Sequence, residues 1–172
     1  TDKKISGIRE LIPVLEQVVK SQKSLLIIAD DFEGDSLPGL VLNRVKSNLK
    51  VVAVKAPGFG ARRDAFLSDI AAMTGAKVAS SAAGLSLETM KLSDLGTCAK
   101  VTVDRNTTTI VAHASQAVVD AVKAKVEELK TQLNLDVTLS DDDRNLLRQR
   151  VAKLSSGVAI IRVGGATELE MV

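Results

Sequence analysis

The most informative segment of the sequence for the fold is Lys50-Val-Val-Ala-Val-Lys-Ala-Pro-Gly-Phe-Gly-Ala-Arg-Arg-Asp64. Its first half is a short continuous apolar run, which is typical of strands covered on both faces in parallel sheets with flanking helices. Its second half is a glycine turn followed by the start of a helix. Because such turns let the backbone approach an anion at a helix N-terminus, the stretch poses the question of a phosphate site.

Helical and strand patterns alternate on both sides of this stretch. A second apolar run, Leu25-Leu-Ile-Ile-Ala29, predicts a neighbouring strand. Helices are predicted over residues 11–19, over 35–46 with Pro38 in the first turn, and over 62–74 before Gly75. The order of these elements predicts an α/β fold.

The second half of the chain begins with a different pattern. Residues 77–109 read as short strand-like pieces, notably 99–104 and 107–111, and predict a meander. Ser115 then caps a long helix whose apolar residues recur at spacings of three and four.

A second helix of this region opens at Ser140, with Asp143 in the position of a capping box, and ends at Gly157. A strand is predicted from Val158 to Val163. We therefore expect two antiparallel helices that close the unit and a final strand.

Composition limits the function classes. The chain has 172 residues, of which 45% are apolar, 26% charged and 2% aromatic, as expected for a globular protein with an aliphatic core. Its formal net charge is only +2 and its cations are scattered, so nothing predicts nucleic-acid binding. A single cysteine, Cys98, excludes an internal disulfide and favours a reducing compartment.

The termini and the apolar runs exclude two further classes. No run reaches the roughly 18 apolar residues of a membrane span, and Thr1-Asp-Lys-Lys is not a signal sequence, so we expect a soluble chain without membrane contact. Since an initiator Met is absent, we expect a piece of a longer protein.

No residue set in the sequence supports catalysis or a metal site. Gly58 and Gly60 are followed by Arg63 where a dinucleotide fingerprint needs a third small residue, and no Walker A ending occurs. His113 is the only histidine, and Cys98 is interpreted as a small buried side chain. Asp141-Asp-Asp143 suits a helix N-terminus better than a metal.

Two helices carry more apolar surface than one core face requires. Their apolar residues span about 160° and about 200° of the helical wheel, against roughly 100° for one face. These residues are Leu11, Ile12, Val14, Leu15, Val18 and Val19, and then Leu37, Leu40, Val41, Leu42 and Val45. Either both helices are buried on two sides, or the excess lines an exposed apolar groove that binds a partner.

Several motifs together resemble the large subunit of group I chaperonins, the GroEL family. The most specific are Lys55-Ala-Pro-Gly-Phe-Gly60 with Arg62-Arg63, and the closing Gly157-Val-Ala-Ile-Ile-Arg-Val-Gly164 with Ala166-Thr-Glu168. Shorter matches are Lys3-Lys-Ile-Ser, Pro13-Val-Leu-Glu16, Glu33-Gly34, Asp69-Ile-Ala71, Thr107-Thr-Thr-Ile110 and Arg150-Val-Ala-Lys-Leu154.

The resemblance implies an apical domain of the swivelling β/α type over residues 1–157, lacking its N-terminal part, and the start of a return strand into the intermediate domain over 158–172. In the family, two helices bind non-native polypeptides and the mobile loop of the co-chaperonin in an apolar groove. Gly157 aligns with the hinge glycine. Carried over by position, the contact residues are Ile12, Leu15, Glu16, Val19, Leu37, Leu40, Val41, Leu42 and Asn43.

The family also implies partners, cofactors and a compartment. Other subunits would complete a ring, and ATP with Mg would bind an equatorial domain that has no counterpart here, so this piece should have no cofactor and no ATPase activity. The compartment would be the chloroplast stroma or mitochondrial matrix, with the bacterial cytoplasm as the alternative. Departures include Pro38-Gly39 and Arg44 in the second groove helix, and Phe32, expected to add exposed apolar area.

Two other functions stay open at this point. One is a nucleotide- or phosphosugar-binding enzyme domain that uses Gly58, Gly60, Arg62 and Arg63. The other is a purely structural interaction module. In the chaperonin interpretation the glycine turn is a tight connector, with Phe59 packing back and the arginines paired with nearby carboxylates.

Overall fold

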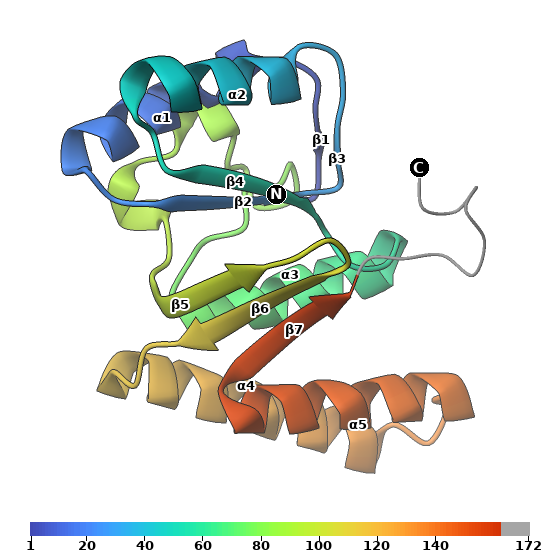
Figure 1. The fold of residues 1–172 in the computed structure, drawn as a ribbon. Helices are drawn as coiled ribbons and strands as arrows, with labels where there is room; N and C mark the ends of the chain where they lie inside the picture. The colour runs from blue at the N-terminus through green and yellow to red at the C-terminus, as the bar shows by residue number, and fades with distance from the viewer. Residues whose placement is uncertain (163–172) are drawn as a thin grey trace. The chain divides into compact units, whose positions relative to one another are not determined.

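Both apolar runs form strands in the computed structural model, which describes residues 1–162 (Figure 1). The chain divides into two units. Unit 1 comprises Thr1–Leu67 and Lys77–Leu95, and unit 2 comprises Ser68–Ala76 and the chain from Gly96 onward. The predicted α/β class is confirmed.

Two helix-strand segments with the same spacing build unit 1. Helix α1 (Ile12–Ser21) leads to strand β2 (Leu25–Ala29), and helix α2 (Ser36–Ser47) leads to strand β4 (Val51–Lys55). Strands β2 and β4 pair in parallel, with Leu25 opposite Val51, as the apolar runs predicted. Because each helix precedes one of two parallel neighbours, both helix C-termini lie at the same end of the strand pair.

Both helices end in the same way. Gln22 after α1 and Asn48 after α2 have left-handed backbone, with φ of 56° and 50°. A left-handed residue stops a helix and turns the chain, and Asn tolerates this conformation better than most residues other than Gly. Each strand therefore starts three residues after its helix stop.

The core of unit 1 joins these segments to shorter ones. Strand β1 (Lys4–Ile5) pairs in parallel with β3 (Asp31–Phe32), and a 3₁₀ helix η1 (Ile8–Leu11) precedes α1. Phe32 packs partly buried against the core, so the expectation that it adds exposed apolar area is wrong. The buried members are Ile5, Leu11, Val14, Leu15, Val18, Ile27, Ala29, Leu40, Leu49, Val51, Ala79 and Met90.

Residues 77–95 do not form the strands that were predicted for this region. They contain two short 3₁₀ helices, η2 (Leu87–Thr89) and η3 (Leu92–Asp94). The side chain of Gln17 on α1 donates to the Met90 carbonyl at 3.2 Å and accepts from the Leu92 backbone N–H at 2.8 Å. Because these bonds join residues more than 70 positions apart, local sequence pattern does not reveal them.

Unit 2 contains the antiparallel sheet. Strands β5 (Cys98–Val103), β6 (Thr107–Ala112) and β7 (Val158–Arg162) pair in the order β5-β6-β7, with β6 in the centre. The hairpin of β5 and β6 confirms that part of the predicted meander. Strand β7 pairs with β6, and residues 163–172, on which the predicted passage into an intermediate domain rests, lie outside the described residues.

Three helices contribute to unit 2. Helix α3 (Gly60–Thr74) passes from unit 1 into unit 2, and α4 (Gln116–Leu135) and α5 (Asp141–Ser156) form the predicted antiparallel pair (Figure 1). Both predicted caps are confirmed. The Ser115 hydroxyl oxygen accepts from the Val118 N–H at 3.4 Å, and that of Ser140 accepts from the Asp143 N–H at 3.1 Å.

A buried ion pair connects α3 and α5 within unit 2. The Arg150 guanidinium donates from Nε and Nη2 to the two oxygens of Asp69, at 2.7 and 2.8 Å. Both side chains are 9% exposed. A bidentate pair satisfies both carboxylate oxygens, which is what a charge removed from water requires.

Candidate functional site

One face of α1 is exposed. At about 100° of rotation per residue, Ile12, Glu16 and Val19 lie on one side of the helix, and all three are exposed. Val14, Leu15 and Val18 lie on the other side and belong to the core. Leu15, one of the predicted contact residues, is therefore buried in this structure, with 5% of its surface accessible.

Helix α2 buries much less of its apolar surface. Leu40 and the N-terminal Ser36 are its buried residues. Asn43 is partly buried, and its amide donates to the Gly39 carbonyl at 2.9 Å. The exposed apolar residues are Leu37, Val41, Leu42 and Val45.

We call the exposed apolar side chains of both helices the apolar helix face. They account for six of the thirteen large apolar side chains that are exposed among residues 1–162. The prediction of apolar surface beyond the needs of the core is thus confirmed, and burial of both helices on two sides is wrong. The members are Ile12, Val19, Leu37, Val41, Leu42 and Val45.

The contact residues predicted from the family resemblance differ from the exposed residues at three positions. Leu15 and Leu40 were predicted as contacts and are core residues, 5% and 4% exposed. Val45 was not among the predicted contacts and is 77% exposed, more than any other member of the face. The wide apolar arc of α2 was the signal in the sequence that could have included Val45.

The position of α2 depends on a close approach of η1. A Cβ built on Gly39 would lie 2.6 Å from Ile8 Cβ and 2.8 Å from Ile8 Cγ1. Glycine at this position therefore allows the helix to approach Ile8 more closely than any other residue would. Pro38 lies on the exposed side, in the first turn, where a missing N–H leaves no helix bond broken.

The glycine turn before α3 holds its second arginine in ion pairs. Nη1 of Arg63 lies 2.7 Å from Oδ1 of Asp30, and Nη2 lies 3.0 Å from Oδ1 of Asp64. The hydrogen bond to Asp30 raises the pKa of the Arg63 guanidinium. Because two carboxylates already oppose this charge, Arg63 is poorly placed to hold a phosphate, and its predicted pairing is confirmed.

The rest of the turn is open. Gly58 and Gly60 have φ of 76° and 54°, which side chains other than glycine rarely adopt. Phe59 between them is 89% exposed, so the prediction that its ring packs back is wrong. Arg62 is exposed and forms no ion pair with any of residues 1–162.

The remaining reactive side chains do not assemble into a site. Partial burial raises the pKa of the Cys98 thiol, which disfavours a thiolate nucleophile. His113 is exposed after the end of β6. Among residues 1–162, no three side chains of His, Cys, Asp or Glu are grouped so that they could hold a metal ion. No helix in that part of the chain is long and apolar enough to cross a membrane.

Gly157 lies between α5 and β7 and has the left-handed backbone expected of a helix stop, with φ of 68°. Its N–H donates to the Leu154 carbonyl at 3.2 Å. A Cβ at Gly157 would meet no atom within 4 Å, so backbone conformation, not space, favours glycine here. The predicted role as a hinge stays a prediction.

Known proteins match almost the whole length of this chain. The chain is 52% identical over 172 residues to Chaperonin GroEL from Wolbachia sp. subsp. Brugia malayi (strain TRS), covering 99% of this chain and 30% of that protein. It is 49% identical to Chaperonin GroEL from Wolbachia sp. subsp. Drosophila simulans (strain wRi), covering 99% of this chain and 31% of that protein. No family model matches the chain.

A solved structure supports the fold. The crystal structure of the chaperonin gp146 from the bacteriophage EL 2 (Pseudomonas aeruginosa) matches 98% of this chain and 34% of its own, with a TM-score of 0.62 and 19% identity. At that identity the likeness concerns the fold alone. The chain spans about a third of the length of each of these three proteins.

Proposed function

Because this chain belongs to the GroEL-type chaperonins, we propose that it captures non-native polypeptides on the apolar helix face as part of a protein-folding ring. The observation that carries the proposal is the exposure of aliphatic side chains on successive turns of two helices, up to 62% for Val41 and 77% for Val45. A folded protein keeps such surface exposed when a partner covers it for part of the time.

The chemistry of this face suits a promiscuous binder. Its members are aliphatic side chains that gain free energy by burial without directional bonds, at about 25 cal/mol per Å² of apolar area. A folded client offers few contiguous apolar residues, whereas an unfolded one offers many. Selection for the non-native state therefore needs no specific sequence.

The core residues beneath the face have a supporting role in this proposal. Leu15 and Leu40 anchor α1 and α2 to the core and so set the separation of the exposed side chains. Glu16 is exposed beside Ile12 and Val19 and can meet polar groups of a bound segment. The Asn43 amide already donates a hydrogen bond to the Gly39 carbonyl, so in this proposal it contributes less to contacts with a bound polypeptide.

Co-chaperonin binding and ring assembly belong to the same proposal. A mobile loop of a GroES-type co-chaperonin would compete for the apolar helix face, and Gly157 would serve as the hinge. In a ring, several faces would bind one client, and multivalency would raise avidity without new contacts.

We further propose that the chain itself has no ATPase activity. Its glycine turn holds Arg63 in ion pairs with Asp30 and Asp64, which argues against the nucleotide- or phosphosugar-binding alternative. ATP and Mg would act elsewhere in the longer protein. Both Wolbachia relatives are bacterial, so we propose the bacterial cytoplasm in place of the chloroplast or mitochondrion.

Substitution of an exposed valine tests the proposal. Val41→Glu places a carboxylate on the exposed side of α2, one turn from both Leu37 and Val45, where binding of an apolar segment would have to desolvate it. We expect at least about a tenfold loss of affinity, equal to about 1.4 kcal/mol. The measurement is fluorescence anisotropy with reduced, carboxymethylated α-lactalbumin as a permanently unfolded probe. Leu15→Glu is unsuitable because it would place a charge in the core.

The matched control is Val137→Glu, since Val137 is 82% exposed and lies in unit 2. We expect this variant to bind the probe as the unmodified chain does. Equal losses in both variants, or no loss in Val41→Glu, would contradict the proposal. Micromolar binding of ATP without probe binding would instead support the nucleotide-binding alternative.

A further inference from the structure

The apolar helix face ends in a group of cations that the proposed function does not use. We call them the basic end of the face. All are exposed, and they come from both helices and from the segments that follow them. The members are Lys20, Lys23, Arg44, Lys46 and Lys50.

The fold brings these cations together. Strands β2 and β4 start in register, and the N–H of Leu25 donates to the carbonyl of Lys50 at 2.8 Å. Lys23 is two residues before Leu25 in sequence, so Lys23 and Lys50 lie near the same end of the strand pair. Lys20 is in the last turn of α1 and Arg44 and Lys46 are in the last turn of α2.

These positive charges are not neutralised within the described chain. None of the five side chains forms an ion pair or a hydrogen bond with any of residues 1–162. By contrast, Lys4, Lys55 and Lys77 of the same unit are each paired with a carboxylate. Residues 17–29 and 36–63 contain no Asp or Glu.

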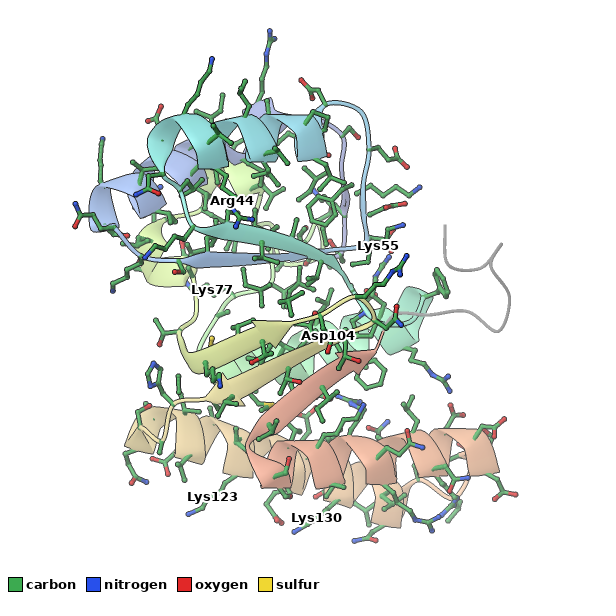
Figure 2. All side chains as sticks on the ribbon, viewed as in Figure 1. Arg44, Lys55, Lys77, Asp104, Lys123 and Lys130 are labelled. Carbon is green, nitrogen blue, oxygen red and sulfur yellow. The ribbon has the colours of Figure 1, made fainter. Side chains whose placement is uncertain are left out.

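Helix dipoles account for only part of this charge. Each helix C-terminus carries about −0.5 of an elementary charge, so the ends of α1 and α2 together offset about one of the five positive charges. Figure 2 shows Arg44 on the side of α2 that is turned toward β4, at the end of the helix where the strand begins. Arg44 and Lys46 lie within about one and a half helical turns of Val41, Leu42 and Val45 on α2.

The nearest carboxylates do not cancel it. Glu16 is the one acidic residue of α1 and lies one turn before Lys20. Glu88 on η2 is exposed, and Asp94 on η3 is paired with Lys77. The elements that pack on α1 thus bring two further acidic side chains that form no ion pair with any of residues 1–162, Glu10 on η1 and Glu88 on η2, against five cations. Glu10 precedes the N-terminus of α1, at the end opposite to Lys20.

We propose that the apolar helix face prefers segments of non-native polypeptide in which carboxylates flank the apolar residues. This inference rests on the proposed function. Apolar side chains of the segment would cover Val41, Leu42 and Val45, and its carboxylates would lie at the basic end. Charge complementarity of this kind changes the rate of encounter and the choice of partner more than it changes total buried area.

Three peptides test the preference. They share one apolar segment of Leu, Val and Phe and differ in the flank, which is Asp-Glu-Asp, Gln-Gln-Gln or Lys-Arg-Lys. We expect the acidic peptide to bind about tenfold more tightly than the basic one at about 50 mM salt, with the neutral peptide between them. At about 500 mM salt the difference should fall below about threefold, because exposed charges are then screened.

A triple substitution with a matched control connects the preference to the basic end. Lys23→Gln, Arg44→Gln and Lys46→Gln together should abolish the difference between the peptides while the neutral peptide still binds. The control is Lys100→Gln, Arg105→Gln and Lys123→Gln in unit 2, which removes the same three charges and takes the formal net charge from +2 to −1 as well. Figure 2 shows Lys123 pointing away from the β5-β6-β7 sheet.

The outcomes separate the two proposals. Equal binding of all three peptides at low salt, or a difference that survives the first triple substitution, would overturn the charge preference and leave polypeptide capture intact. Loss of the difference in the control would assign it to net charge instead of the basic end. Failure of all three peptides to bind would overturn capture itself.

Discussion

Gly39 lies inside helix α2 although glycine has a low helix propensity. Glycine in a helix interior is less favourable than alanine by about 0.5–1 kcal/mol. In α2, however, a Cβ at this position would lie 2.6 Å from Ile8 Cβ, an atom so close to the backbone that it cannot move alone. The position therefore favours glycine for packing and not for local conformation.

Gly39→Ala should accordingly destabilise unit 1. We expect a net loss of about 1–3 kcal/mol in free energy of unfolding, the usual cost of inserting a methyl group into a packed contact. Urea unfolding followed by circular dichroism measures it. Ser47→Ala in the same helix is exposed and should be neutral or slightly stabilising. If the Gly39→Ala variant is more stable than the unmodified chain, η1 must shift away from the added methyl group at little cost in free energy.

At the scale of elements, the ion pair of Asp69 and Arg150 connects α3 to α5 in unit 2. Burial of both charges makes the pair costly to form, and removal of one partner leaves the other unpaired in a dry environment. As whole residues, Asp69 and Arg150 are only 7% and 8% exposed, so water has little access to the pair. The pair therefore contributes more to the specific placement of the helices than to net stability.

Single and double substitutions distinguish these contributions. Asp69→Ala should lower the free energy of unfolding by about 3–5 kcal/mol, because it leaves the Arg150 guanidinium buried without a partner. The double variant Asp69→Leu with Arg150→Met should lose less than the single variant, since no charge remains buried. Guanidinium chloride titration of the set checks this order, and a double variant weaker than Asp69→Ala would contradict it.

At the scale of the whole molecule, several partly exposed carboxylates have lowered pKa values. A hydrogen bond from the Lys55 side chain lowers the pKa of Asp31, and one from Lys77 lowers the pKa of Asp94. In unit 2, a hydrogen bond from the Thr138 side chain lowers the pKa of Asp136. Each of these groups favours the folded state only while it is ionised.

The sign of the pH dependence follows from these directions. Because the folded pKa values lie below the ordinary value of 3.8, the stabilisation is complete above about pH 4 and is lost as pH falls through the folded values. We expect urea midpoints to fall as the pH drops below about 4. Lys55→Met with Lys77→Met should show a smaller fall, and an unchanged fall would assign the acid sensitivity to other groups.

Local sequence pattern predicted the five α-helices and strands β2, β4, β5, β6 and β7, but not β1, β3 or the 3₁₀ helices. The apolar runs identified β2 and β4, and Ser115, Ser140 and Gly157 marked helix ends where the structure places them. These features depend on residues within a few positions of one another, so local pattern is sufficient. The motifs around the glycine turn also indicated the family, because a match in the order of residues needs no coordinates.

Which apolar side chains are exposed to a partner depends on tertiary contacts. Leu15 and Val19 belong to one apolar pattern, yet the first is buried and the second is exposed. Val45 is the most exposed member of the apolar helix face, and the five cations of its basic end lie at the same end of unit 1 because β2 and β4 pair in register. Burial and proximity depend on contacts between residues distant in sequence, and periodicity along one helix does not contain that information.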